Sequence, residues 1–195
     1  MSKTGPPDSS TRQQLLDVAL ELFTVQGYDA TSLRQIADRV GVTKAALYYH
    51  FPAKDNLVIE LTRPWLDAVS NLIAMANAGD DDVDRDALLA DYLDVFLTHH
   101  AVLRFLNRDA GAHKHPDVGK RAQALVEALR QALTGPDADA DGRVRVACSL
   151  GVIHAVAGLD ATVVRESRHT VLEAASSVLH GRGAPRIVRA GGGVA

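Results

Sequence analysis

Apolar side chains recur three or four residues apart along most of the chain, and this spacing restricts the possible folds more than any other feature. Leu15, Ala19 and Phe23, for example, fall on one face of a helix. Runs in which Val, Ile and Thr alternate with polar residues are missing, and aromatic residues make up only 5% of the chain. Because Ala and Leu dominate instead, the composition favours helices over sheet. We therefore predict an all-α fold.

Glycine, proline and capping residues divide this pattern into separate helical segments. Gly27 and Gly41 suit the left-handed residue at a helix end, and Pro52 biases the residue before it away from helix. Thr31 and Thr43 are candidate N-caps. Pro64 lies inside a long segment and is expected to kink it. The expected helices cover residues 9–27, 31–40, 43–49, 53–77, 85–98, 100–110, 116–133, 143–159 and 162–180.

The helices divide into a compact three-helix head, residues 9–68, and a larger helical body, residues 69–181. The remaining segment, 182–195, is rich in glycine and carries three arginines and no acid, so we predict a disordered tail. The single Cys148 excludes an internal disulfide and suits a reducing cytosol. The longest mostly apolar stretch without charge, Val146 to Leu159, is shorter than the ~20 residues of a membrane-spanning helix. These features predict a cytoplasmic protein with no membrane partner.

The segments 31–40 and 43–49 have the spacing of a helix-turn-helix. Gly41 permits the tight turn between them, and the small Ala37 allows a close crossing. In this motif the N-terminal turn of the second helix enters the major groove of DNA. The net charge of the whole chain is −3, yet residues 32–54 hold four basic residues and one acidic residue, a local charge of +3. Such a run can also mark only a solvated face, so the motif needs further support.

Residues 27–57, GYDATSLRQIADRVGVTKAALYYHFPAKDNL, resemble the DNA-binding head of the TetR family of transcriptional regulators. The positions that match the family pattern at fixed spacing are Gly27, Tyr28, Thr31, Ile36, Ala37, Gly41, Val42, Leu47, Tyr48, His50, Phe51, Lys54 and Leu57. The resemblance implies a homodimer that binds a palindromic DNA operator and usually represses transcription. It also implies that a small-molecule effector binds in the body and moves the two heads apart, and that the last two helices form the dimer interface.

Several side chains of the head are expected at the DNA. An arginine such as Arg34 can read guanine, and the hydroxyls of Thr31 and Ser32 suit a phosphate, although they can equally be plain helix caps. Lys54 matches a phosphate contact of the family, and His50 is either a backbone contact or a packed histidine. The predicted DNA-binding residues are Thr31, Ser32, Arg34, Thr43, Lys44, Ala45, Tyr48, Tyr49, His50 and Lys54, while Leu47 and Phe51 should be core.

In the body, small residues on one side of the penultimate helix allow another helix to approach closely, either from a second chain or within the same one. Together with the apolar stripe of the last helix they give the expected dimer interface: Gly151, Ala155, Gly158, Val164, Val171, Leu172, Ala175, Val178 and Leu179. Aromatic and histidine side chains are candidates for an effector pocket, although each can also be core: Trp65, Tyr92, Phe96, His99, Phe105 and His154.

Two other kinds of function remain open. His99, His100, His113 and His115 flank one helical segment and could gather a metal ion, which would give a metal-responsive regulator; a regulator without any ligand is also possible. An enzyme is disfavoured, because Glu166-x-x-His169 is only half of a di-iron helix motif and no Gly-rich phosphate loop, HExxH or GxSxG occurs. We predict a DNA-binding repressor without a cofactor, released by an unknown small molecule.

Overall fold

Every regular element in the computed structural model is a helix within residues 9–78, 83–108, 116–135 and 138–181, which are the residues that it describes. This confirms the predicted all-α fold. The elements are α1 (Ser9–Gln26), α2 (Leu33–Val40), α3 (Lys44–His50), α4 (Lys54–Asn77), α5 (Arg85–Thr98), α6 (His100–Arg108), α8 (Pro116–Thr134), α9 (Ala140–Ala155), the short 3₁₀ helix η1 (Val156–Gly158), α10 (Ala161–Glu166) and α11 (Arg168–Leu179).

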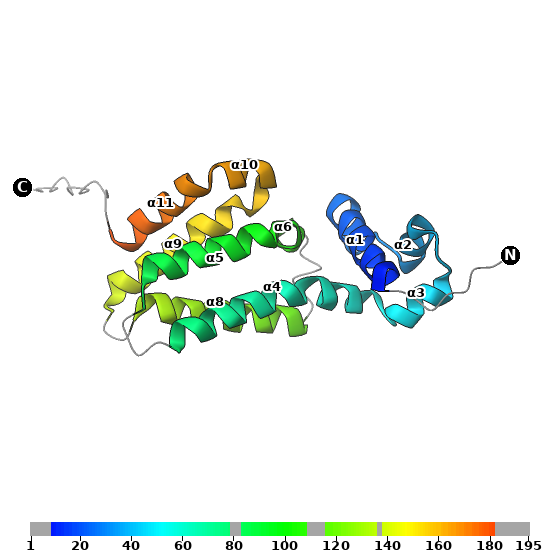
Figure 1. Ribbon diagram of the computed structural model, residues 1–195, viewed down its shortest axis with the longest axis horizontal. Helices are drawn as coiled ribbons and strands as arrows, with labels where there is room; N and C mark the ends of the chain where they lie inside the picture. Colours follow the sequence, from blue (N-terminus) through cyan, green and yellow to red (C-terminus); the bar gives the residue numbers. More distant parts are fainter. Residues whose placement is uncertain (1–8, 79–82, 109–115, 136–137, 182–195) are drawn as a thin grey trace, which may run out of the picture.

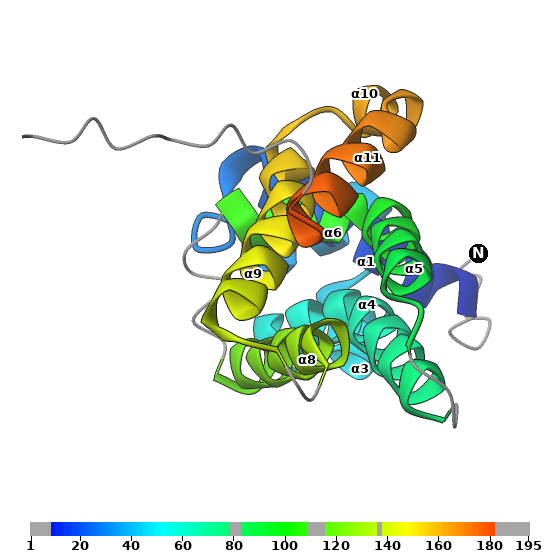
Figure 2. The ribbon, with the colours of Figure 1, turned by 90° about the vertical axis from the view of Figure 1, so that its left-hand side faces the viewer.

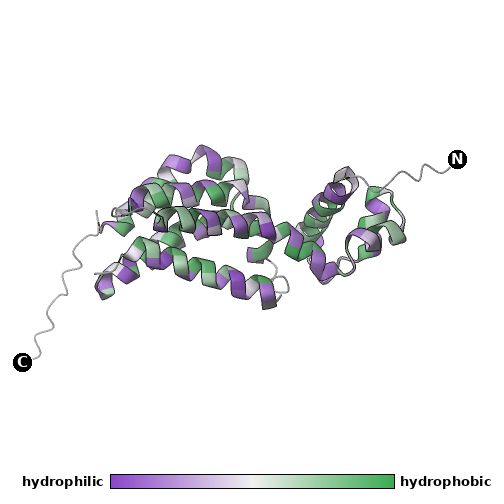
Figure 3. Ribbon diagram, turned by 60° about the horizontal axis from the view of Figure 1, so that its bottom comes forward, coloured by the Kyte–Doolittle hydropathy of each residue, from purple (hydrophilic) through white to green (hydrophobic). Residues whose placement is uncertain are grey.

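The molecule is elongated, with α1, α2 and α3 gathered at one end and the other helices forming a larger bundle (Figure 1). Helix α4 begins in the head and continues into the body, where it packs against α5 and α8. Seen along its length, the body has α4 and α8 on one side and α5, α9 and α11 on the other (Figure 2). Each helix carries both hydrophobic and hydrophilic stretches (Figure 3), as expected for helices that bury one face.

The head owes its shape to well-capped short helices around a small core. Ser32 caps α2 by accepting a hydrogen bond from the backbone N–H of Gln35, whose side chain in turn accepts from the N–H of Ser32. Thr43 caps α3 through Ala46, as the sequence predicts. Between them Gly41 takes a left-handed φ of 79°, and its N–H donates to Ala37, which closes the turn. The fully buried residues that these helices bring together include Leu15, Ala19, Phe23, Ile36, Leu47 and Phe51.

Three predicted elements differ from the structure. The predicted helix 143–159 begins earlier, as α9 (Ala140–Ala155), and its last turn is the 3₁₀ helix η1 (Val156–Gly158). The cap of α2 is Ser32 and not Thr31, because the Thr31 hydroxyl points back and donates to the carbonyl of Gly27 at 2.8 Å. The expected last helix, 162–180, is two helices, since Ser167 leaves helical geometry between α10 and α11. Helix α4 does continue through Pro64. The predicted tail, 182–195, lies outside the described residues.

Head and body touch through aromatic side chains as well as through α4. Phe23 of α1 stacks on Phe105 of α6, with ring centroids 5.4 Å apart and planes inclined by 24°. Both rings are almost completely buried. Glu60 of α4 pairs with Arg12 of α1 and with Arg63 of its own helix. Helix α1 is therefore held both to α4 and to α6 of the body. In the part of the chain that the structure describes, no helix is long and apolar enough to cross a membrane.

Candidate nucleic-acid interface and internal cavity

Helix α3 presents a mixed basic and aromatic face to solvent. Leu47 and Phe51 are buried and fix the helix against the head, while Lys44 and Ala45 are exposed. Tyr48 is 42% exposed, and the Lys44 ammonium lies 5.3 Å from the centre of its ring. Tyr49 projects further, with 74% of its surface accessible. The packing of α3 thus leaves one side free to meet a partner.

Two side chains at the start of α2 are also accessible. Ser32 is exposed, and the Arg34 side chain is 82% exposed with only a loose 3.6 Å contact to Asp38. The other basic residues of the segment are engaged: Arg39 pairs with Glu21 at 2.7 Å, and Lys54 is held by the backbone. Of the local positive charges, Arg34 and Lys44 are therefore the ones presented outward.

Lys54 and Thr31 have partners different from the phosphate that the sequence predicts. The Lys54 ammonium donates to the carbonyls of Tyr28 and Thr31, at 2.7 and 2.9 Å, and lies 4.1 Å from the centre of the Tyr28 ring. Thr31 is buried, and its hydroxyl is bound by Gly27 and Gln26. Both residues hold the 28–31 loop in place before α2, a structural role that the sequence did not predict.

His50 is half-buried at the end of α3. Its ring meets Tyr49 edge-on, with centroids 5.5 Å apart, and its Nε2 is buried without a hydrogen-bond partner among the described residues. This environment fits the packed histidine better than a DNA backbone contact, since the buried nitrogen cannot reach a phosphate outside the head.

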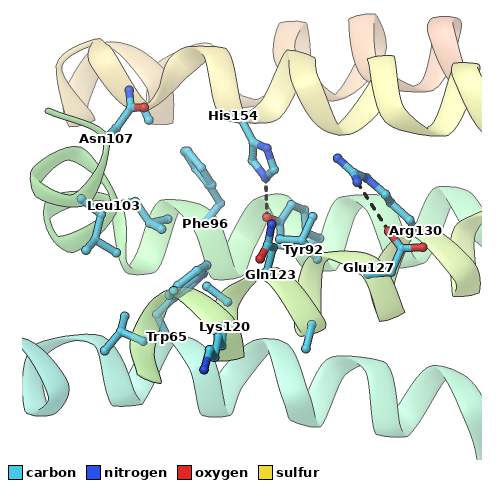
Figure 4. Close-up of a pocket in the computed structure, with 17 residues that line it drawn as sticks. Trp65, Tyr92, Phe96, Leu103, Asn107, Lys120, Gln123, Glu127, Arg130 and His154 are labelled. Atoms are coloured by element: carbon cyan, nitrogen blue, oxygen red, sulfur yellow. Dashed lines mark hydrogen bonds and ion pairs between the residues drawn. The ribbon is translucent and has the colours of Figure 1, made fainter. Parts of the chain in front are cut away.

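A cavity of about 1130 Å³ lies in the body between α4, α5, α6, α8 and α9 (Figure 4). Four of the six predicted pocket residues line it: Trp65, Tyr92, Phe96 and His154. The other two do not. Phe105 is buried against Phe23 at the head, and His99 caps α5 away from the cavity.

Sequence reasoning missed the side of the cavity that α8 supplies. Lys120, Gln123, Glu127 and Arg130 recur three or four residues apart on this helix and line the cavity. They are polar and accessible, so they were indistinguishable from an ordinary solvent-facing stripe. The only available signal was their regular spacing on one face of the helix.

A neutral hydrogen-bonded pair lies at the centre of the cavity wall. The Tyr92 hydroxyl and His154 Nε2 are 2.6 Å apart, reaching from α5 and α9 (Figure 4). Burial raises the pKa of the Tyr92 phenol, so it stays protonated. Burial, together with the positive charge of Arg130, lowers the pKa of His154 below its usual 6.5. Near neutral pH this pair therefore offers hydrogen bonds without carrying charge.

The predicted dimer residues fall into three groups by their exposure. Val164, Val171, Ala175 and Leu179 are buried within the single chain, because α11 packs on α9 and α5. They form part of the core of the single chain. Leu172 and Val178 are partly buried. The small residues are accessible: Gly151, Ala155 and Gly158 are exposed, next to the exposed apolar side chains Val144, Leu159 and Val163.

The histidines proposed as metal ligands are only partly within the described residues. His100 is buried and packs its ring edge on Phe96, and burial lowers the pKa of His99. His113 and His115 lie outside the described ranges. Within those ranges no group of three or more His, Cys, Asp or Glu is placed to hold a metal ion.

Known proteins resemble the chain in two ways. Residues 15–61 match the family model described as bacterial regulatory proteins, tetR family. The HTH-type transcriptional regulator AcrR of Shigella flexneri is 46% identical over 70 residues, 36% of this chain and 31% of that protein. The HTH-type transcriptional repressor KstR2 of Rhodococcus jostii (strain RHA1) is 41% identical over 70 residues, 33% of this chain and 34% of that protein. The matched segment thus spans about a third of the length of these relatives.

The resemblance in structure extends over nearly the whole chain. The crystal structure of Mycobacterium smegmatis AmtR superposes with a TM-score of 0.70 at 25% identity, covering 91% of this chain and 89% of that one. The head therefore matches in sequence, and head and body together match in fold. Residues 15–61 thus carry a tetR-family DNA-binding domain, and domain and fold together indicate a TetR family transcriptional regulator.

Proposed function

We propose that this chain represses transcription by binding a palindromic DNA operator as a homodimer, and that a small molecule in the body cavity releases it. The observation that carries the proposal is the outward face of the head, where Arg34, Lys44 and Tyr48 are accessible on α2 and α3 while the residues behind them are buried. Such a face is what major-groove recognition by a helix-turn-helix needs.

Each exposed side chain of this face suits a particular part of DNA. Arg34 and Lys44 can donate to guanine or to phosphate, and Ala45 can touch a thymine methyl group. The Tyr48 hydroxyl suits a phosphate oxygen, and Tyr49 can extend the same contact along the backbone. The Thr43 and Ser32 hydroxyls already cap their helices, so their part at DNA lies in holding the helix N-termini toward it.

The cavity is placed where a ligand can influence the head. Trp65 lines it and belongs to α4, which also forms part of the head. Leu103 and Leu106 of the cavity lie on α6, beside the Phe105 ring that stacks on Phe23. A ligand that moves either helix therefore acts on the two contacts that anchor the head. Together with the size of the cavity, this arrangement supports a small-molecule effector.

The second copy of the chain would pack on the accessible small residues of α9 and η1. Gly151 and Gly158 have open space where a side chain would begin, which leaves room for a partner helix. The exposed Val144 and Val163 extend this surface with apolar area. Light scattering that shows a monomer at micromolar concentration would contradict the homodimer.

Footprinting on the DNA upstream of the protein's own gene tests the proposal. The expected result is a protected palindrome whose half-sites lie about one helical turn or somewhat more apart. Arg34→Ala should weaken operator binding by about 1–3 kcal/mol and relax the base preference at one position of each half-site. Arg39→Ala is the matched control, because this arginine pairs with Glu21 and should leave the base preference unchanged. Binding without any sequence preference would contradict the proposal.

A further inference from the structure

We propose that the cavity binds an amphipathic ligand with an apolar body and a carboxylate head, the head lying at Arg130 and the Tyr92–His154 pair. This inference rests on the proposed function, since it names the chemical class of the effector. Three observations carry it: an apolar end, a polar end, and the balance of charge along the walls.

The mainly apolar end lies toward α6 and the start of α8, where Asn107 and Lys120 are the polar residues of the lining (Figure 4). Trp65, Phe96 and Leu103 face the cavity there (Figure 4), and Leu106 and Val118 complete its walls. An alkyl chain or ring system in this region would be removed from water, which stabilises binding by roughly 25 cal/mol per Å² of apolar surface. The Trp65 Nε1–H is buried and has no hydrogen-bond partner among the described residues, so this end also has one donor available to a ligand acceptor.

The polar end lies further along α8. The Arg130 guanidinium extends toward His154 from the opposite helix (Figure 4), and its charge influences the pKa of that histidine. Its contact with Glu127 is loose, at 3.5 Å, and both side chains are about half exposed. Arg130 therefore keeps donors for a second partner. A guanidinium matches a carboxylate with two parallel N–H donors, and the neighbouring pair can add a neutral hydrogen bond.

The charged residues that line the cavity favour an acidic ligand over a basic one. The charged residues that line the cavity are Lys120, Arg130 and Glu127, two cations and one anion. Glu127 and Arg130 contact each other and their charges largely offset, whereas Lys120 makes no hydrogen bond or ion pair among the described residues, so the lining keeps a net positive charge. A cationic head group at Arg130 would be repelled by the guanidinium, whereas a carboxylate would be attracted to it.

The chain provides its own reporter for a test, because Trp65 is the single tryptophan and lines the cavity. Its fluorescence can be followed while the purified full chain is titrated with decanoate, 1-decanol and decyltrimethylammonium, each below its micelle concentration. The three probes share the apolar body and differ in the charge of the head. We expect saturable binding of decanoate, at least about tenfold tighter than that of decyltrimethylammonium and tighter than that of decanol.

Variants then locate the head group. Arg130→Gln should remove most of the preference for decanoate over decanol while decanol still binds, which shows that the cavity is intact. Arg121→Gln is the matched control on the same helix, since this arginine pairs with Asp67 and does not line the cavity. The inference is overturned by tighter binding of decyltrimethylammonium, by equal binding of decanoate and decanol, by no binding of any probe, or by an unchanged preference in Arg130→Gln.

Operator binding, measured separately, keeps this inference distinct from the proposed function. A chain that binds its operator but prefers the cationic probe would remain a regulator with a different effector class. Conversely, if the chain prefers decanoate but binds no operator, the ligand class assigned to the cavity stands and the proposed function is wrong.

Discussion

Replacing Lys54 with Met should destabilise the protein by about 2–4 kcal/mol. The ammonium group makes two hydrogen bonds to backbone carbonyls, at 2.7 and 2.9 Å, and lies over the Tyr28 ring. Bonds to a charged group contribute about 1.5–3 kcal/mol each, and because Lys54 is only half-buried we take the lower end. The ring contact adds about 0.5 kcal/mol. Met keeps the apolar stem and the helix propensity of Lys, so the change isolates the loss of the ammonium.

Urea denaturation measures this effect directly. With a slope of about 2 kcal/mol per M, a loss of 3 kcal/mol lowers the midpoint by about 1.5 M. Both proteins should be compared at one concentration, since a dimer's apparent stability depends on it. Lys44→Met is the matched control: Lys44 is exposed, so its replacement should change stability by no more than about 0.5 kcal/mol.

The salt dependence of DNA binding should change in Lys44→Met and not in Lys54→Met, the reverse of the order expected for stability. Losing a phosphate contact reduces the dependence of log affinity on log salt by about one unit. We expect this reduction in Lys44→Met and little of it in Lys54→Met, measured at temperatures where both variants are folded. The assignment of Lys54 to the loop would be refuted by a midpoint shift below about 0.25 M together with a flattened salt dependence, because that combination is the behaviour of a phosphate contact.

Three further changes test other parts of the structure. Ser32→Ala removes the cap of α2 and should cost about 1 kcal/mol by urea denaturation; an unchanged midpoint would show that the cap is dispensable. Phe105→Ala opens a hole beside Phe23 and should cost about 3–5 kcal/mol, whereas the exposed Tyr49→Ala should cost less than about 0.5 kcal/mol. The lowered pKa of His154 means that, as the pH falls below 6.5, the unfolded chain binds a proton that the folded chain does not. Stability should thus decline with acidification, and His154→Gln should lessen this decline; an identical pH dependence in the two proteins would contradict it.

The helical segments could be predicted because local rules determine them. Gly41 takes the left-handed conformation and Thr43 caps α3, as their types suggest. The division of the last segment could not be foreseen, because Ser167 is compatible with a helix interior. The break follows from tertiary packing, in which Val164 of α10 and Val171 of α11 are both buried while the chain between them turns.

The exposure of a side chain could be predicted where it depends on its own helix, and its contacts could not be predicted where they depend on another element. Lys44 and Tyr48 share one face of α3, so their exposure follows from helical spacing. The role of Lys54 depends on two carbonyls of a loop more than 20 residues earlier in the chain, which no local pattern reveals. The same holds for Val171 and Ala175, whose apolar stripe packs on α9 of the same chain.

Helix α4 gives a physical route between the cavity and the DNA-facing residues. Lys54 in its first turn fastens the loop that precedes α2, and Trp65 lines the cavity eleven residues later, about 16 Å along the helix axis. Between them Pro64 lacks the N–H that would donate to the carbonyl of Glu60, so the helix is most easily bent next to the residue that lines the cavity. Because Glu60 also holds Arg12 of α1, a bend at this position changes a head contact directly. A ligand that displaces Trp65 by a small distance can therefore reorient the α2 N-terminus without disturbing the core of the head.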